Sequence, residues 1–214
     1  ILFRPIKRLT DHTSEGIMLR ELIREDIAVY SPHTAYDSAA EGINAQLANR
    51  FDLTGVCPIR PVSEELAAKA PHLSELGSGR IGELPAEMSL GEFADRVAEK
   101  LPGLAGVQFV GAANRSVQKI GIACGSAAEF LRDARRMGAE VLLTGEARFH
   151  ACLEARDLGI ALVVAGHYAT ERLGIEHLAE LIENEFPTLK VAASNTETDP
   201  LQFRSQNRKQ KADT

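Results

Sequence analysis

The chain has 214 residues, of which 44% are hydrophobic, which is enough to form a sizeable buried core in one domain or in two small lobes. Its 30 acidic side chains outnumber its 24 basic ones, so the formal net charge of −6 argues against non-specific binding to the phosphates of nucleic acids. Three widely spaced cysteines without a C-x-x-C motif favour reduced thiols in the cytoplasm, and the lack of a signal peptide or a bilayer-length apolar stretch argues against a membrane protein.

Residues 1–56 are predicted to be the remainder of a first α/β lobe. A helical pattern over residues 18–25 is followed by the β-rich run 27–30, and a second helical pattern covers residues 39–51. The chain starts with apolar residues and without an initiator Met, so we expect that an upstream part of this lobe is missing.

Residues 57–88 are predicted to connect two lobes, because they are rich in proline and glycine, with one short helix at 63–69. The sequence SLGE at residues 89–92 matches a capping box, in which the serine and glutamate side chains each bond the other's backbone N–H group. A helix is therefore expected from this point to Leu101.

Residues 89–203 are predicted to form a second α/β lobe, in which strands and helices alternate. We expect strands at 107–110, 120–123, 141–143 and 160–164 and near Val191, and helices at 127–137, 147–158 and up to Glu183. Nearly all-apolar strands separated by helices are typical of a mostly parallel sheet covered on both faces, so the predicted fold class is α/β. An apolar strand, a short break, a histidine and an acid occur in this order at both 27–37 and 160–171, which suggests two similar lobes. Residues 204–214 are expected to be a disordered tail.

Three pairs of a histidine and an acid, each four residues apart, come after predicted strands: His33 with Asp37, Glu146 with His150, and His167 with Glu171. Ligands of parallel sheets bind beyond the carboxyl ends of the strands, so these side chains are the first candidates for a functional site. Imidazole and carboxylate donors together suit divalent Zn, Mn, Fe, Co, Ni or Mg, and carboxylates can bridge two such ions. The pattern therefore indicates a site for divalent metal ions, of unknown identity.

Each of these residues also has a purely structural interpretation. Asp37 could cap a helix, His33 could be a turn residue, His167 could be a core imidazole, Glu171 could be favoured by a helix dipole, and Glu146 with His150 could be a surface pair. Cys124-Gly125-Ser126 lies at a strand-to-helix turn, where it could hold a nucleophile or simply let the chain turn. No dinucleotide-binding glycine motif and no P-loop is present in the sequence.

Four segments of the chain resemble the Nif-three-like family, whose bacterial members are often called GTP cyclohydrolase 1 type 2 homologs. These segments are LFRPIK (2–7), YSPHTAYD (30–37), LTGEARFH (143–150) and AGHYATE (165–171). The resemblance extends to about Pro200 and implies two similar α/β lobes facing each other across a dinuclear metal site, in subunits that form a ring-like homohexamer. It places Asp37, His167 and Glu171 on metal ligands. It also implies that His33, Glu146 and His150 lie near the metals, where we regard them as acid/base candidates.

The chain departs from the family pattern at its start, where a His-His-Pro segment with further metal ligands would precede residues 1–3. The short connector implies the compact form, without the inserted domain of longer relatives. We expect a metal-dependent hydrolase acting on a nucleotide-like or phosphorylated small molecule. The alternative is a non-catalytic metal-binding or protein-interaction module with a regulatory role.

Overall fold

The computed structural model describes residues 6–70, 73, 75–104 and 106–204, and the chain divides into two compact units, Ile1–Ala35 and Tyr36–Thr214. The described part of the first unit contains helix α1 (Ser14–Arg24), close to the predicted helix. The hydroxyl oxygen of Thr13 caps this helix by accepting a bond from the backbone N–H of Gly16 at 3.1 Å. A threonine in this position satisfies one of the free N–H groups of the first turn.

The predicted strand at residues 27–30 is wrong. These residues form no regular secondary structure, and Tyr30 is 87% exposed. A β-rich run becomes a strand only when a neighbouring strand completes its hydrogen bonds, and the described residues provide no such partner for this run.

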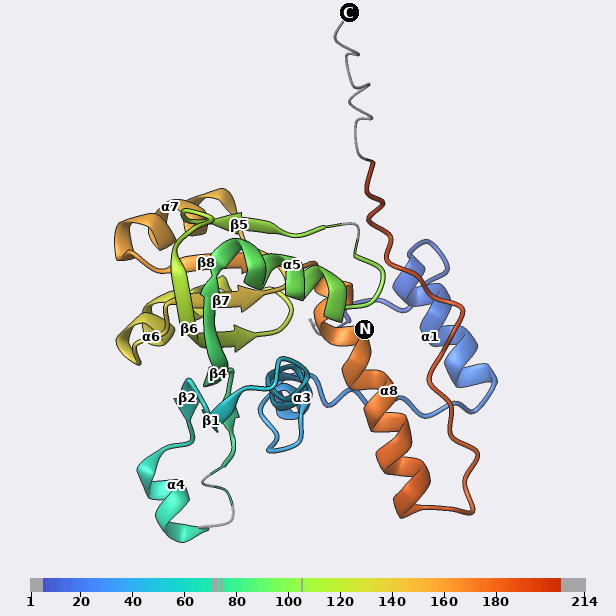
Figure 1. Cartoon of the computed structure of the whole chain (residues 1–214). Helices are drawn as coiled ribbons and strands as arrows, with labels where there is room; N and C mark the ends of the chain where they lie inside the picture. Colours follow the sequence, from blue (N-terminus) through green and yellow to red (C-terminus); the bar gives the residue numbers. More distant parts are fainter. Residues whose placement is uncertain (1–5, 71–72, 74, 105, 205–214) are drawn as a thin grey trace, which may run out of the picture. The chain divides into compact units, whose positions relative to one another are not determined.

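The second unit is built on a six-stranded mixed sheet with the order β1-β4-β6-β7-β8-β5 (Figure 1). Its strands are β1 (Thr54–Cys57), β4 (Arg80–Ser89), β5 (Gln108–Val110), β6 (Ser116–Ala123), β7 (Val141–Thr144) and β8 (Ala161–Val164). Strands β6, β7 and β8 are parallel and central, whereas β4, β1 and β5 pair antiparallel. The α/β class is thus confirmed, and the three central strands are its parallel part.

Helices cover both faces of this sheet. Helices α3 (Ile43–Arg50), α5 (Leu90–Lys100) and α8 (His167–Glu185) pack on one face, and the 3₁₀ turn η2 (Ala128–Phe130) with α6 (Leu131–Arg136) and α7 (Phe149–Leu158) packs on the other. Successive residues of one strand point to opposite faces, so Leu142 joins the core under α6 and α7, while Leu143 joins the core under α3 and α5. This sandwich fixes the ends of the parallel strands.

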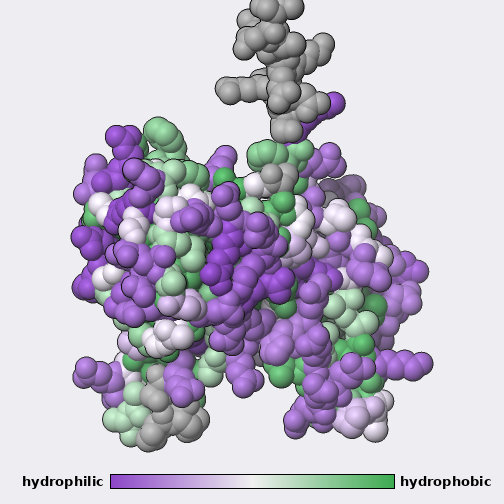
Figure 2. Space-filling model, viewed as in Figure 1, coloured by the Kyte–Doolittle hydropathy of each residue, from purple (hydrophilic) through white to green (hydrophobic). Residues whose placement is uncertain are grey.

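The sequence of helix α5 determines both where the helix begins and which face it buries. Ser89 and Glu92 form the predicted capping box, with the Ser89 N–H donating to the Glu92 carboxylate at 2.8 Å and the Glu92 N–H donating to the Ser89 hydroxyl at 3.2 Å. Phe93 and Val97 are fully buried four residues apart on the inner face. The outer face is charged, and Figure 2 shows a mainly hydrophilic surface over this helix.

The predicted connector, residues 57–88, contains the small ladder of β2 (Arg60–Pro61) and β3 (Gly77–Ser78), helix α4 (Glu64–Lys69) and most of strand β4. The predicted strand near Val191 is wrong, because the chain there has no regular structure and runs on as an extended segment to residue 204. The rest of the predicted tail, residues 205–214, lies outside the described residues. None of the helices in the described part of the chain has the length and apolar character that crossing a membrane requires.

Candidate metal centre

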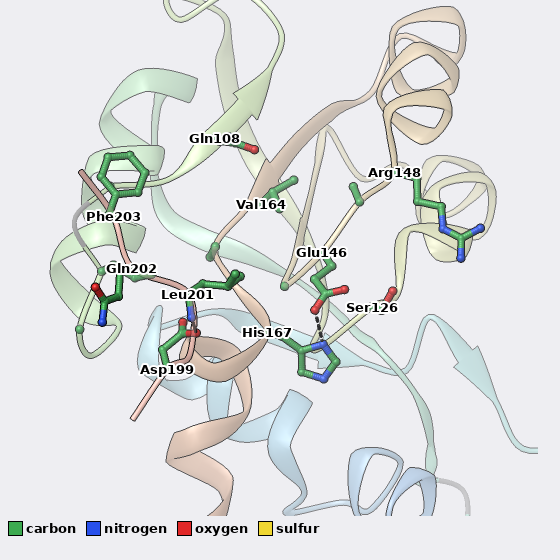
Figure 3. A pocket seen from close by; sticks show the side chains of 17 residues that line it. Gln108, Ser126, Glu146, Arg148, Val164, His167, Asp199, Leu201, Gln202 and Phe203 are labelled. Carbon is green, nitrogen blue, oxygen red and sulfur yellow. Dashed lines mark hydrogen bonds and ion pairs between the residues drawn. The ribbon is translucent and has the colours of Figure 1, made fainter. Parts of the chain in front are cut away.

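A pocket of about 480 Å³ lies at the carboxyl ends of the three parallel strands. Ser126 follows β6, Gly145 to Arg148 follow β7, and Val164 to His167 end β8 and begin α8. Figure 3 shows Glu146 and His167 between Ser126 with Arg148 on one side and Leu201 with Phe203 on the other. This is the edge of the sheet at which ligands of α/β folds bind.

Three glycines, one after each parallel strand, form the floor of the site. The Glu146 N–H donates to the Gly125 carbonyl at 2.9 Å, and the Gly166 N–H donates to the Gly145 carbonyl at 2.9 Å. A Cβ atom on Gly145 would lie 2.7 Å from the Gly125 carbonyl oxygen, so the two backbones are in direct contact. Glycine is required here because no side chain fits between the loops.

Two buried threonines hold this floor in place. The Thr170 hydroxyl accepts from the Gly125 N–H at 3.1 Å and lies 3.0 Å from the Gly166 carbonyl oxygen, to which it donates. The Thr144 hydroxyl donates to the Gly125 carbonyl at 3.1 Å. Buried hydroxyls with satisfied hydrogen bonds make such loops rigid, so the side chains above them have fixed starting points.

His167 is the first residue of α8, and both of its ring nitrogens contact carboxylates. Its Nδ1 lies 2.6 Å from Glu146 Oε1 (Figure 3). Its Nε2 lies 3.1 Å from Oε1 of Glu171, one helical turn further on. Glu146 lies in the loop before α7, which begins at Phe149, and from there it contacts His167. A carboxylate on one ring nitrogen orients an imidazole and makes its other nitrogen a better ligand.

Asp37, at the end of the short helix α2 (Thr34–Asp37), reaches the same site through Cys124. The buried Cys124 thiol follows β6 and hydrogen-bonds the Asp37 carboxylate. Burial, and then the negative charges of Asp37 and Glu171, raise the pKa of this thiol far above its usual value. The Cys124 thiol thus lies close enough to Asp37 and Glu171 for both carboxylates to affect its pKa, and Glu171 in turn contacts His167.

Asn44 on α3 joins the two segments that carry Asp37 and Cys124. Its buried side chain donates to the Asp37 carbonyl at 3.0 Å and accepts from the Cys124 N–H at 2.8 Å. The loop after Asp37 is also held by the buried guanidinium of Arg80, which donates to the Ala39 carbonyl at 2.6 Å and to the Gly77 carbonyl at 2.6 Å. The position of Asp37 is thus set by the surrounding fold.

The structure places the residues that the sequence singled out in different ways. His167, Glu171, Glu146 and Asp37 belong to the cluster just described. His150 is exposed on the first turn of α7 and is not among the residues that line the pocket, and His33 lies in the first unit with a φ of 42°. Roles in catalysis for His33, Glu146 and His150 stay predictions.

Sequence reasoning missed the buried partners of these side chains. These are Asn44, Thr144, Thr170 and the Cys124 thiol, for which the sequence suggested a nucleophile or a simple turn but no contact with Asp37. Asn44 and Thr170 lie within helices, where a polar residue usually faces solvent, so the sequence carries no signal for their burial. For Cys124, its place directly after an apolar strand was the available signal.

The donor chemistry of this cluster fits a divalent metal ion. Two ligands at about 2.0–2.2 Å from one ion and at roughly a right angle are about 3 Å apart, and His167 Nε2 and Glu171 Oε1 are 3.1 Å apart. Gly125 leaves the necessary space, since a Cβ atom there would lie 2.4 Å from Glu171 Oε1 and 3.3 Å from His167 Nε2. As the side chains stand, no three His, Cys, Asp or Glu residues within the described ranges are arranged to hold an ion. Metal binding by three of these side chains would therefore require at least one of them to move.

Comparison with known proteins identifies relatives over most of the chain. The model of the family Duf34/NIF3 (NGG1p interacting factor 3) matches residues 1–200. The chain is 28% identical to the GTP cyclohydrolase 1 type 2 homolog of Clostridium perfringens, covering 95% of this chain and 74% of that protein. It is 32% identical to the Protein NIF3 homolog of Schizosaccharomyces pombe, covering 94% of this chain and 73% of that protein.

A solved structure shows the same fold. The chain superposes on Staphylococcus aureus protein SA1388 with a TM-score of 0.80 and 26% identity, covering 94% of this chain and 77% of that one. The residues that the family model matches, 1–200, include the strands of the sheet, the glycine floor and His167. The chain is therefore a member of the Duf34/NIF3 family.

Proposed function

We propose that this protein binds two divalent metal ions and is a metal-dependent hydrolase for a nucleotide-like or phosphorylated small molecule. The observation that carries the proposal is the cluster of His167, Glu171 and Asp37 around the Cys124 thiol, beside a pocket at the ends of the parallel strands. Carboxylates that gather around one imidazole and one buried thiol create a negative potential, which favours binding of a cation.

The proposed ligands are Asp37, His167 and Glu171, for Zn, Mn, Fe, Co, Ni or Mg ions. When bound, such ions would stabilise developing negative charge on the substrate and make a water more acidic. Glu146 would hold His167 in place through the 2.6 Å contact with Nδ1 and could take up a proton at its carboxylate. His150 and His33 are kept as further acid/base candidates.

Membership of the family also supports the remaining parts of the proposal. The relatives named GTP cyclohydrolase 1 type 2 homolog are the reason to test nucleotides first. We further propose a cytoplasmic protein that assembles as a homohexamer of two-lobed subunits. Light scattering coupled to size-exclusion chromatography would measure the mass of the assembly.

A second His–Glu pair on the same helix provides a matched control for the metal site. His177 Nδ1 lies 3.6 Å from Glu180 Oε2 on α8, away from the carboxyl ends of the parallel strands. The experiment compares His167→Ala and Glu171→Gln with His177→Ala and Glu180→Gln. Each protein is dialysed against Zn or Mn, and the bound metal per chain is measured by elemental analysis.

We expect the first two variants to lose metal and the two control variants to retain it. Equal metal content in all four variants, or no metal in the unmodified protein, would refute the metal site. A panel of nucleotides and phosphate esters then tests catalysis, with Asp37→Ala as the inactive reference. Metal binding without turnover above Asp37→Ala on that panel would favour the alternative, a metal-binding or interaction module.

A further inference from the structure

The segment after α8 folds back along this helix. We call its residues 194–203 the C-terminal strap. Arg172 of α8 ties it down, with Nη2 donating to the Ser194 carbonyl at 2.6 Å and Nη1 donating to the Glu197 carboxylate at 2.5 Å. The Tyr168 hydroxyl adds a bond to the Glu197 carbonyl at 3.3 Å. The Arg172 side chain is 12% exposed, whereas that of its partner Glu197 is 46% exposed. The first part of the strap is thus fixed by polar contacts.

The last part of the strap forms one wall of the pocket beside His167. The lining residues it contributes are Asp199, Leu201, Gln202 and Phe203, and Leu104 contributes a further apolar side chain. Figure 3 shows Leu201 and Phe203 on one side of His167 and Arg148 on the other. The pocket therefore has an apolar side, with His167 between it and Arg148.

The fold buries little of the two apolar side chains of this wall, Leu201 and Phe203. Leu201 is 75% exposed and Phe203 is 67% exposed, although both line a pocket. Single exposed apolar residues are common on protein surfaces. A leucine and an aromatic ring on the wall of one concave pocket differ from these, because such groups make up the lining of small-molecule sites.

The charged side chains that line the pocket indicate which polar group a ligand would carry. Arg148 is the cationic side chain of the lining, and it forms no ion pair with any described residue. Of the two acidic lining residues, Glu146 contacts His167, and Asp199 accepts a bond from the Leu201 N–H at 2.8 Å. Both carboxylates thus have partners within the protein, whereas the guanidinium is available to an anion.

We propose that the pocket binds an anionic ester with a flat apolar group, which packs on Leu201 and Phe203 while the anion faces Arg148. In this arrangement the ester bond lies over His167, so the inference rests on the proposed function and narrows its substrate class. Arg172 is then a positioning residue, because it acts on the ligand only by holding the strap.

Phenyl phosphate and methyl phosphate are suitable probes, since they carry the same anion and differ in the apolar group. Their dissociation constants for the zinc-treated protein can be measured by ligand-observed NMR. We expect phenyl phosphate to bind about tenfold more tightly than methyl phosphate. The double variant Leu201→Ala, Phe203→Ala should lose this preference and bind methyl phosphate unchanged.

Phe186 and Leu189 provide the matched control, because they are exposed apolar residues of the segment after α8 that do not line the pocket. The double variant Phe186→Ala, Leu189→Ala should retain the preference for phenyl phosphate. Arg172→Gln should reduce the preference and increase hydrogen exchange of residues 194–203. A second arginine, Arg115, donates to the Gly159 carbonyl, and Arg115→Gln should change neither quantity.

The inference is overturned if neither probe binds, or if the Leu201→Ala, Phe203→Ala protein keeps the preference for phenyl phosphate. Metal content is measured in the same samples, so the two proposals can fail separately. Bound metal without a preference would refute the apolar subsite alone. If the zinc-treated protein holds no metal, the metal centre is refuted. A preference of that protein for phenyl phosphate that depends on Leu201 and Phe203 would still support the apolar subsite.

Discussion

Replacing Gly125 with alanine perturbs the candidate metal centre in a way that the structure quantifies. Gly125 has a φ of 63°, and an added Cβ atom would lie 2.4 Å from Glu171 Oε1. The left-handed conformation costs an alanine about 1–2 kcal/mol. The contact with Oε1 is impossible without movement, so the Glu171 carboxylate must leave its present position, 3.1 Å from His167 Nε2.

Gly159 provides a control that separates the backbone strain from the steric contact with Glu171. It has almost the same φ, 66°, at the end of α7, and an added Cβ atom would meet no atom within 4 Å. Gly159→Ala should therefore lower the free energy of unfolding by about 1–2 kcal/mol through backbone strain alone. Gly125→Ala should show at least this loss and, in addition, weaker metal binding.

Urea unfolding of the metal-free proteins measures the first quantity, and competition of zinc with a chelating dye measures the second. We expect the zinc affinity of Gly125→Ala to be lower by about tenfold or more, in the range seen when groups around a metal ligand are displaced. The affinity of Gly159→Ala should equal that of the unmodified protein. Equal zinc affinities for the two variants would refute the argument that Gly125 makes room for a metal ligand.

Three further predictions concern the support of the site and the fold around it. Asn44→Ala should lower the free energy of unfolding by about 1–3 kcal/mol, because it leaves a partly buried carbonyl and a buried N–H without this partner, and urea unfolding would detect this loss. In protein with Cys152→Ser, a disulfide reagent at pH 8 should label exposed Cys57 long before Cys124, because burial and nearby carboxylates raise the pKa of Cys124 and keep it a thiol; equal rates by mass spectrometry would contradict this. Ser89→Ala should cost about 1 kcal/mol in urea unfolding by removing the cap of α5, whereas an unchanged midpoint would show that the capping box contributes nothing.

Local sequence patterns correctly predicted those helices and strands that depend mainly on their own residues. The capping box at Ser89 and Glu92 sets the start of α5, and the apolar runs around Leu143 and Val163 become central strands because both of their faces are covered. The run at residues 27–30 shows the limit of this reasoning. Its composition is typical of a strand, yet strand formation also depends on a partner that composition cannot reveal.

The candidate site was predictable only in part for a related reason. The spacing of His167 and Glu171 on one helix indicated that they would meet, and the structure places them 3.1 Å apart. The contact of Glu146 with His167 joins two different loops, so no spacing within the sequence could indicate it. The hydrogen bonds of Asn44 likewise form only when distant segments of the chain pack together, so no local sequence pattern indicates them.

The glycine floor has a consequence for how this fold could acquire new chemistry. Main-chain hydrogen bonds join the three loops: the Glu146 N–H donates to the Gly125 carbonyl and the Gly166 N–H donates to the Gly145 carbonyl, and exchange of a neighbouring side chain leaves both bonds intact. Positions such as 124, 146 and 167, each next to one of these glycines, can thus vary while the loops keep their course. One unchanging platform could in this way present different sets of donors, so ion preference can diverge among proteins that share this architecture.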